Sequence, residues 1–434
     1  MNCFAAWAEQ TAPGIDWREK WMSANEHEDE RRMRMSLMTV VLASAISCGG
    51  AQAQKKYDIG ASDTEVRIGQ TVPYSGPVSG LSIFGRVETG YFKMLNERGG
   101  INGRKVRIIS ADDGYSPPKT VEQTRRLVEQ EEVLAVMASL GTPTNIAVRK
   151  YLNGKKVPQL LVLSSSAQWN NPRDYPYSTS MNIAADQEAI AMGRYIAGKH
   201  KGAKIGILYQ NDDYGKDYVR ALKEGLGEDG RRAIVQELSY DVSSPTIDSQ
   251  VVTLKTSGAD LVVAAATPKF GALAARKMFE MQWKPYRYMA AGAIGSLKSA
   301  LDPEIANGLI SISFYRDPND PKLEGEEDGK EYFEFMKKYA PNDNPRDMAA
   351  VYAYITAQVG AEILKRCGDN LTRENLLRIA TNLKDVSVKL LFDGVSINTS
   401  PTDYLPIKKA RMIEFDGMSW KSFGDPIDAP TPSP

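Results

Sequence analysis

The chain has 434 residues, 42% of them hydrophobic and 25% charged, a composition typical of a globular protein of two or three domains. The formal net charge is zero, because 54 basic side chains balance 54 acidic ones. This balance leaves no basic field of the kind that nucleic-acid binding requires, so we expect no nucleic-acid partner.

The N-terminal region is typical of an export signal preceded by an extension. A 12-residue apolar run at 36–47 follows the basic stretch 31–35 and precedes a small-residue cleavage site that ends at Ala53. The run is too short to span a bilayer. We therefore expect a signal peptide at about 31–53 and a periplasmic protein.

Residues 1–32 stand before this signal and contain three tryptophans and an acidic run. They predict an over-long translation start, with Met33 or Met35 as the true one. Cys48 offers an alternative, a lipoprotein signal, but Ala45 stands where a bulky aliphatic residue is usual. We favour export without a lipid anchor, and an N-terminal core helix is a further alternative.

From residue 65 onward, short apolar runs alternate with amphipathic stretches. The apolar runs are typical of buried parallel strands, and the stretches between them have helical spacing. The expected strands of this first series are 65–73, 105–113, 133–139 and 158–166, and the expected helices are 87–100, 121–130 and 145–153.

A second series repeats the pattern. Its expected helices are 186–199, 214–229, 249–258 and 271–283, and its expected strands are 204–210, 233–241, 259–266 and 286–292. After a strand at 309–317 come helices at 331–340, 348–367 and 372–383, and then a β-rich ending at 410–424. Two such series predict an α/β protein with two doubly wound lobes.

Doubly wound sheets bind ligands beyond the carboxyl ends of their strands. The loops expected there are rich in Gly, Ser, Thr, amide and aromatic side chains, and poor in paired acids. This composition suits holding a small polar molecule rather than transforming it.

The expected exported chain is short of catalytic and metal-binding side chains. Without residues 1–53 it keeps one cysteine, Cys367, and one histidine, His200, which lies in a lysine-rich turn. A zinc site of His and Cys has no ligands, and the sequence contains neither a GxSxG elbow nor a phosphate-binding loop. We therefore expect no catalytic residues, no cofactor and no metal site.

The stretch QNDDYGKDY has the density of aspartates seen in calcium loops, but its register excludes one. If Gly215 is the turn glycine at loop position six, position twelve is Ala221, where a bidentate glutamate is needed. Asp212 and Asp213 instead predict the start of a helix, where carboxylates accept from free N–H groups. Tyr214 is then expected at the strand-to-helix corner.

Five segments in order are similar to the periplasmic solute-binding proteins of branched-chain amino acid (leucine/isoleucine/valine-binding) ABC transporters. They are PYSGPVSGLSIFGR, NERGGINGRKVRIISADDGYSPPKT, VMASLGTPTNIAV, VPQLLVLSSSA and KIGILYQNDDYGKDYVRALKEGL, and the resemblance covers residues 63–425. It implies a type I periplasmic binding protein fold, in which two lobes joined by three crossover strands close on the ligand by a hinge motion. The implied divisions are 63–184 plus 314–405 for lobe one, 185–313 plus 406–426 for lobe two, and 427–434 for a tail.

The resemblance also implies a site between the lobes that holds a ligand carboxylate through main-chain N–H and hydroxyl groups of lobe one. The matching positions here are Gly141, Thr142, Ser166, Ala167 and Gln168.

Four further positions match the family's site. Phe84 falls on an aromatic wall, Tyr214 matches a tyrosine that closes over the ligand, and Thr267 occupies an aromatic position. Gly292 stands where the amino acid binders place a carboxylate for the ligand's ammonium group. We expect a small carboxylate-bearing ligand, an amino acid or an aromatic or short organic acid. Because an unpaired ammonium would cost about 2–5 kcal/mol, we favour an acid without an α-amino group.

The resemblance further implies membrane-embedded ABC permease subunits as partners, a role in import, and a monomer. A ligand-binding sensor or receptor module is an alternative, and it would need a signalling domain or a membrane helix. An α/β enzyme is a further alternative, because doubly wound sheets host many enzymes.

Overall fold

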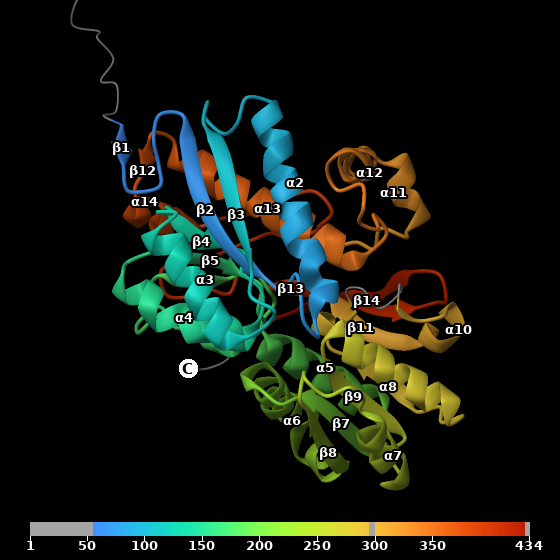
Figure 1. Cartoon of the computed structure of the whole chain (residues 1–434). Coiled ribbons are helices and arrows are strands. Elements are labelled where there is room, and N and C mark those ends of the chain that lie inside the picture. The colour runs from blue at the N-terminus through green and yellow to red at the C-terminus, as the bar shows by residue number, and fades with distance from the viewer. Residues whose placement is uncertain (1–54, 295–299, 430–434) are drawn as a thin grey trace, which may run out of the picture. The chain divides into compact units, whose positions relative to one another are not determined.

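The computed structural model describes residues 55–294 and 300–429, and most of its strands belong to two sheets (Figure 1). The predicted extension, the signal peptide with Cys48 and the last residues of the predicted tail lie outside the described residues. Within the described ranges, no helix reaches the length and apolar character that a membrane span requires.

The first sheet has five parallel strands in the order β3-β2-β4-β5-β6. Its strands are β2 (Glu65–Val72), β3 (Lys105–Asp112), β4 (Ala135–Met137), β5 (Gln159–Val162) and β6 (Ser178–Ser180). The helices between them are α2 (Ile83–Glu97), α3 (Pro117–Glu129) and α4 (Thr142–Gly154). We call the part built on this sheet lobe one.

The second sheet has seven strands in the order β14-β13-β11-β10-β9-β7-β8. Its strands are β7 (Ile205–Gln210), β8 (Ile234–Tyr240), β9 (Leu261–Ala265), β10 (Tyr286–Met289), β11 (Leu309–Ser313), β13 (Lys409–Phe415) and β14 (Trp420–Asp428). Its helices are α5 (Ala185–Lys199), α6 (Asp213–Arg232), α7 (Asp248–Thr256), α8 (Pro268–Glu280) and α10 (Pro303–Ala306). We call this part lobe two.

The two sheets repeat one topology. Counted from its first strand, each has the order 2-1-3-4-5 with parallel pairing, and the second sheet then adds β13 and β14 as antiparallel strands. In this order each sheet has one place where the connections from two neighbouring strands run in opposite directions. This place lies between β2 and β4 in the first sheet and between β7 and β9 in the second. A crevice forms at such a point beyond the carboxyl ends of the strands. The prediction of two doubly wound lobes is confirmed.

The chain between β11 and β13 contributes helices α11 (Pro321–Gly325), α12 (Glu327–Tyr339), α13 (Met348–Cys367) and α14 (Arg373–Ala380). Helices α12 and α13 pack on α2 of lobe one. Helix α13 is buried along most of its length, and its sequence is accordingly apolar on nearly every side. Two short strands, β1 (Lys56–Tyr57) and β12 (Asn370–Leu371), form a separate parallel pair.

Helices α3, α4 and α8 begin earlier than predicted, for one shared physical reason. We expected them to start at 121, 145 and 271, whereas they start at Pro117, Thr142 and Pro268. Each carries a proline at its first or second position, where the missing N–H would have no helical partner and the fixed φ favours the helix. The extra turn brings the start of α4 and α8 next to their strands.

Several short elements were missed, and one strand was predicted too short. Strand β6 has only three residues and reads SerThrSer, a polar sequence that no apolar pattern marks. Strand β14 extends to Asp428, two residues into the predicted tail. The lobe divisions at 184/185, 313/314 and 405/406 remain predictions; strands β2 to β6 lie before the first of these boundaries and β7 to β11 lie after it.

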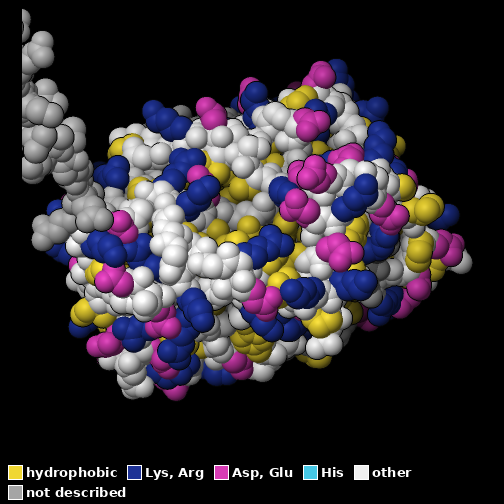
Figure 2. Space-filling model, turned by 90° about the horizontal axis from the view of Figure 1, so that it is seen from above, with side chains coloured by type: hydrophobic (Ala, Val, Ile, Leu, Met, Phe, Trp, Pro, Cys, Tyr) yellow, Lys and Arg dark blue, Asp and Glu magenta, His cyan; other side chains and the backbone are white. Residues whose placement is uncertain are grey.

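The surface carries interspersed charges. Figure 2 shows Lys and Arg side chains mixed with Asp and Glu over one face of the molecule, with hydrophobic side chains in the hollow at its centre. This distribution agrees with the zero net charge of the chain.

Candidate functional site

A cavity of about 120 Å³ lies beyond the carboxyl ends of the strands of both lobes. Loops that follow strands β3, β4, β5, β7, β9 and β10 all reach it, so the crevices of the two sheets face a common space. We call this space the inner cavity. Its lining consists of Leu81, Phe84, Tyr115, Leu140, Gly141, Thr142, Leu163, Ser164, Ser165, Asn182, Ile183, Gln210, Tyr214, Ala266, Thr267, Ala291, Gly292, Phe314, Tyr315, Ala349 and Tyr352.

Lobe one presents the start of helix α4 to the inner cavity. Gly141 is the N-cap residue, with φ at 103°, and a Cβ there would lie 2.6 Å from both the Tyr115 ring and Thr144 Oγ1. Only glycine suits this backbone and this close approach. The first N–H groups of a helix have no intrahelical partner, so those of Thr142 and Thr144 are free to meet an anion.

Hydroxyl groups surround this helix start. Thr142 Oγ1 and Ser164 Oγ are hydrogen-bonded at 2.6 Å, and the Trp169 indole N–H donates to Ser164 Oγ at 2.7 Å. Asn182 Nδ2 donates to Ser165 Oγ at 2.7 Å, while the buried Asn182 Oδ1 has no hydrogen-bond partner. The hydroxyl groups of Thr142, Ser164 and Ser165 are therefore held in place by hydrogen bonds within the site, and Asn182 Oδ1 is an acceptor without a donor.

Lobe two presents Tyr214 at the start of helix α6. Asp212 is the N-cap residue, and its carboxylate accepts from the Gly215 N–H at 3.1 Å, which confirms the capping interpretation of the acidic cluster. A Cβ at Gly215 would lie 2.0 Å from the Gln210 carbonyl oxygen, so glycine lets the helix begin directly at the strand end. Tyr214, the second residue of α6, is thereby fixed at the cavity.

The Tyr214 hydroxyl is buried and has no hydrogen-bond partner. Its side chain is only 8% exposed, and burial raises the pKa of the phenol well above its usual value, so it keeps its proton. A Cβ on Gly292 would stand 3.2 Å from this hydroxyl. The absence of a side chain at Gly292 therefore leaves the hydroxyl room to face the cavity. A buried hydroxyl without a partner is costly unless a ligand supplies one.

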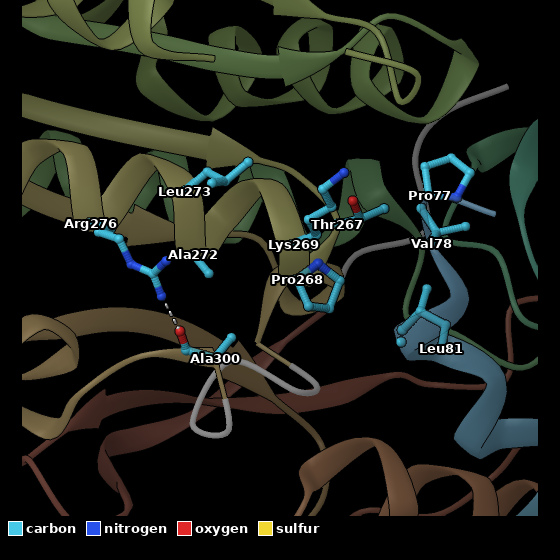
Figure 3. A pocket seen from close by; sticks show the side chains of 11 residues that line it. Pro77, Val78, Leu81, Thr267, Pro268, Lys269, Ala272, Leu273, Arg276 and Ala300 are labelled. Carbon is cyan, nitrogen blue, oxygen red and sulfur yellow. Dashed lines mark hydrogen bonds between the residues drawn. The ribbon is translucent and has the colours of Figure 1, made fainter. Parts of the chain in front are cut away.

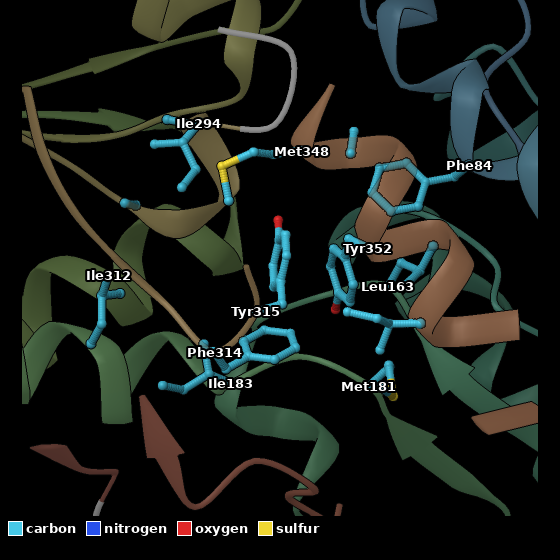
Figure 4. Close-up of a cluster of buried hydrophobic side chains, with 14 of the residues drawn as sticks. Phe84, Leu163, Met181, Ile183, Ile294, Ile312, Phe314, Tyr315, Met348 and Tyr352 are labelled. Atoms are coloured by element: carbon cyan, nitrogen blue, oxygen red, sulfur yellow. The ribbon is translucent and has the colours of Figure 1, made fainter. Parts of the chain in front are cut away.

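Aromatic rings form one wall of the inner cavity. The rings of Tyr315 and Tyr352 are stacked with centroids 5.4 Å apart, and Phe314 and Phe84 each meet Tyr352 edge to face at 5.4 and 5.5 Å. Figure 4 shows this group with Leu163 beside Tyr352. The Tyr352 hydroxyl, like that of Tyr214, is buried without a hydrogen-bond partner.

No Asp, Glu, Lys, Arg or His belongs to the lining formed by the described residues. Glu188 of α5 lies behind it, buried, and accepts from the Ala291 N–H at 2.8 Å and from the Tyr218 hydroxyl at 3.0 Å. Burial raises the pKa of Glu188 to about 7. Both donors meet the same oxygen, Oε1, and Glu188 itself is not among the residues that line the cavity.

Six of the nine predicted ligand-binding residues line this one cavity: Phe84, Gly141, Thr142, Tyr214, Thr267 and Gly292. Their roles toward a ligand remain predictions. Gly292 lies in the short helix η3 (Ala291–Ala293). Thr267 is the N-cap residue of α8, and its backbone N–H donates to the Tyr240 hydroxyl at 3.1 Å.

The other three predicted residues, Ser166, Ala167 and Gln168, do not line the cavity. Ser166 Oγ donates to Asp217 Oδ2 of α6 at 2.8 Å, and Gln168 accepts from Arg149 through its carbonyl oxygen at 2.9 Å. Ala167 begins the short helix η2 (Ala167–Trp169). Strand β5 ends at Val162, four residues before the predicted end, so Ser164 and Ser165 take the place at the cavity.

Several lining residues escaped the sequence interpretation. Ser164 and Ser165 stand in a loop that the strand-end rule marks, so a better strand boundary would have found them. Tyr352 lies inside an apolar helix and Tyr315 beyond a strand of lobe two, and no local pattern separates them from core tyrosines. Among the described residues, no group of His, Cys, Asp and Glu could hold a metal ion.

The family model described as "Periplasmic binding protein" matches residues 65–417. Two relatives are an amino acid binding protein of Pseudomonas aeruginosa, 25% identical over 52% of this chain and 60% of that protein, and Leu/Ile/Val-binding protein homolog 1 of Brucella abortus, 22% identical over 79% of this chain and 87% of that protein.

Two solved structures share the fold. One is a branched-chain amino acid ABC transporter protein of Thermus thermophilus with bound valine, with a TM-score of 0.75 at 17% identity, covering 85% of this chain and 97% of that one. The other is an ABC transporter solute-binding protein of Rhodopseudomonas palustris in complex with 3,4-dihydroxybenzoic acid, with a TM-score of 0.69 at 19% identity, covering 84% and 98%.

The described fold is thus the two-lobed type I periplasmic binding protein fold, with the inner cavity where its two crevices meet. The family match covers most of the chain, and the resemblance to leucine/isoleucine/valine-binding proteins is confirmed. This chain belongs to the periplasmic binding protein family.

Proposed function

We propose that this protein is the extracytoplasmic binding component of an ABC importer and captures a small carboxylic acid that lacks an α-ammonium group. The observation that carries this proposal is the inner cavity itself. Its described lining combines N–H and hydroxyl donors, two tyrosine hydroxyls without partners and an aromatic wall, and it holds no charged side chain.

A carboxylate suits the side of the cavity formed by lobe one. The start of α4 offers free N–H groups and the positive end of the helix dipole, and Thr142, Ser164 and Ser165 add hydroxyls. Such neutral donors bind an anion without a lysine or arginine. From lobe two the protonated hydroxyl of Tyr214 can donate to the same ligand.

An ammonium group finds no charged partner among the described residues that line the cavity. Gly292 brings no carboxylate, and Glu188 is already bound to the Ala291 N–H and the Tyr218 hydroxyl. Burying an ammonium without a charged partner costs about 2–5 kcal/mol, which corresponds to roughly 30- to 4,000-fold in affinity.

Matched ligand pairs test this chemistry. We would compare leucine with 4-methylpentanoate, and phenylalanine with 3-phenylpropanoate, by thermal shift and calorimetry on the full chain. Each acid has the same carbon skeleton as its amino acid partner and lacks only the ammonium group.

We expect at least one acid to stabilise the protein, by about 4 kcal/mol at a thousandfold excess over its Kd, and its amino acid partner to bind at least 30-fold more weakly. Equal or tighter binding of the amino acids would refute the exclusion of the ammonium group. A flat response to all four compounds would refute the carboxylate site.

The importer role includes export, hinge closure and a permease partner. The proposal is supported by the family match and by the sequence at 31–53, which is typical of a signal peptide. We expect the protein in the periplasmic fraction, beginning near Gln54, as a monomer that docks on membrane-embedded permease subunits. N-terminal sequencing of the native protein and fractionation of the native cells check the first two points.

A further inference from the structure

A second cavity of about 350 Å³ adjoins the inner one. The two share Leu81 and Thr267 in their linings, so the space beyond these residues continues outward from the inner cavity. We call it the outer cavity. Figure 3 shows Pro77, Val78 and Leu81 of lobe one opposite Thr267, Pro268 and Lys269 of lobe two across this space.

The described lining of the outer cavity is mainly apolar. Its walls are formed by the loop after β2, through Pro77, Val78 and Leu81, and by helix α8, through Pro268, Ala272 and Leu273. Its two cationic residues already have contacts. Arg276 donates to the Ala300 carbonyl at 2.8 Å, and the Lys269 ammonium lies 5.0 Å from the centre of the Phe270 ring.

The inner cavity offers several groups that could bind a ligand, but its volume is small. A cavity of about 150 Å³ is known to hold one benzene molecule, so the smaller inner cavity, of about 120 Å³, has room for a carboxyl group with only a short chain. A larger molecule has to continue past Leu81 and Thr267. The space that it would enter there is about three times as large and apolar.

We propose that the ligand is a monocarboxylic acid longer than a common amino acid, with its carboxylate held in the inner cavity by lobe one and an uncharged alkyl or aryl tail lying in the outer cavity. This inference rests on the proposed carboxylate site. It adds the substrate class: hydrophobic acids whose affinity rises with tail length.

Two ligand series test the proposal by calorimetry on the full chain. One runs from butanoate to decanoate in single CH2 steps, and the other runs from benzoate to its 4-alkyl derivatives up to 4-pentylbenzoate. We expect affinity to rise about fourfold for each CH2 beyond the first few carbons in at least one series, because burying a CH2 is worth about 0.8 kcal/mol.

A matched pair of variants locates the tail. Leu273 lines the outer cavity and Phe279, on the same helix, is 43% exposed and outside the lining. Leu273→Glu should abolish the gain with tail length and leave the affinity for the shortest bound acid within about twofold. Phe279→Glu introduces the same charge and should change neither. Pro77→Glu, on the opposite wall and exposed, repeats the test if Leu273→Glu unfolds.

The outcomes separate the two levels of the argument. Short acids that bind without any gain from longer tails overturn the outer-cavity inference and leave the carboxylate site standing. A gain with length that survives both Leu273→Glu and Pro77→Glu overturns it as well. If acids of every length fail to bind, the proposed function is refuted and this inference with it.

Discussion

At the scale of single residues, the site depends on how Tyr214 and Gly292 are placed. The hydroxyl of Tyr214 has room to face the cavity because Gly292 has no side chain. A Cβ at position 292 would lie only 3.2 Å from the Tyr214 hydroxyl oxygen. The hydroxyl is buried without a partner, an arrangement that lowers stability and favours ligand binding. The residue matched by the resemblance therefore has geometric reasons to contact a ligand.

Replacing Tyr214 by Phe removes the hydroxyl and keeps the ring. We expect the Kd for the ligand to rise about 2- to 12-fold, the equivalent of roughly 0.5–1.5 kcal/mol for one hydrogen bond. The free energy of unfolding of the ligand-free protein should stay the same or increase slightly, because a buried unpartnered group disappears. Calorimetry and chemical denaturation check the two effects, and unchanged affinity would contradict a contact through this hydroxyl.

Replacement of Tyr214 by Ala is a less informative variant than replacement by Phe. In the structure the side chain is only 8% exposed and meets the Tyr218 ring, with centroids 6.3 Å apart. Truncating a buried aromatic side chain costs about 3–5 kcal/mol, so the Ala variant would lose stability together with affinity.

At the scale of elements, helix starts and buried polar contacts hold the site in place. Helix α6 positions Tyr214, α4 presents its free N–H groups, and Glu188 of α5 fixes the backbone of η3 next to Gly292. Asp212, the cap of α6, and Glu188 lie outside the cavity lining and hold residues that belong to it. Changes in them should therefore affect stability first and ligand binding second.

The N-cap of α6 offers a matched pair of variants. Asp212→Ala removes a carboxylate that accepts from the Gly215 N–H, and we expect a loss of about 1 kcal/mol in the free energy of unfolding. Asp213→Ala removes an exposed acid from the first turn of the helix. It should cost only a few tenths of a kcal/mol, because an exposed acid interacts weakly with the helix dipole. Denaturant unfolding measures both. Equal losses would contradict the capping role of Asp212.

Glu188 predicts a specific pH dependence. Burial raises its pKa from 4.5 to about 7, so between these values the folded protein binds a proton that the unfolded chain releases. Its contribution to stability is then fully present below about pH 4.5 and is lost as the pH rises through 7. Between pH 4.5 and pH 8 we expect the free energy of unfolding of the wild type to fall by roughly 1–3 kcal/mol relative to that of Glu188→Gln, whose amide does not titrate.

Denaturant unfolding at pH 4.5, 6 and 8 measures this difference for Glu188→Gln. The amide keeps the size of the carboxyl group and an acceptor for the Ala291 N–H, and the comparison with wild type cancels the other titrating groups. A difference that stays constant with pH would show that Glu188 titrates near its ordinary value.

At the scale of the whole molecule, hydrogen bonds join the two lobes beside the site. Ser166 of lobe one donates to Asp217 of α6 at 2.8 Å, and Gln210 of lobe two donates to the Tyr115 hydroxyl of lobe one at 3.4 Å. Asp217 also pairs with the mostly exposed Arg220. Ser166 thus joins the two lobes without lining the cavity.

We expect Ser166→Ala to raise the apparent Kd for the ligand about 2- to 12-fold, because the binding-competent closed form becomes less populated. Asp217→Ala should act in the same direction, and the double variant should show no further loss if the two residues act through one bond. Calorimetry gives the affinities. Small-angle scattering should show a larger ligand-free radius of gyration for Ser166→Ala, and fully additive losses would contradict the shared bond.

Features that depend on residues close together in the sequence could be predicted from it. Buried parallel strands and amphipathic helices are set by hydrophobic periodicity within a segment, so most elements and the doubly wound class could be predicted. Asp212 could be identified as a cap because its partner, Gly215, is three residues away. Short polar elements such as β6 lack this periodicity and were missed.

The cavity depends on contacts between residues far apart in the chain. Phe84, Tyr214 and Gly292 could be named because each stands at an expected strand end or matches a family position, and they meet in one cavity. Tyr352 could not be named, because only the packing of α13 against α2 and the loop after β11 carries it there. Ser166 was assigned to the ligand, whereas its side chain bonds across to Asp217. Local sequence carries period, caps and turns, and it contains no information on which distant loops share a cavity; that depends on how the two sheets pack.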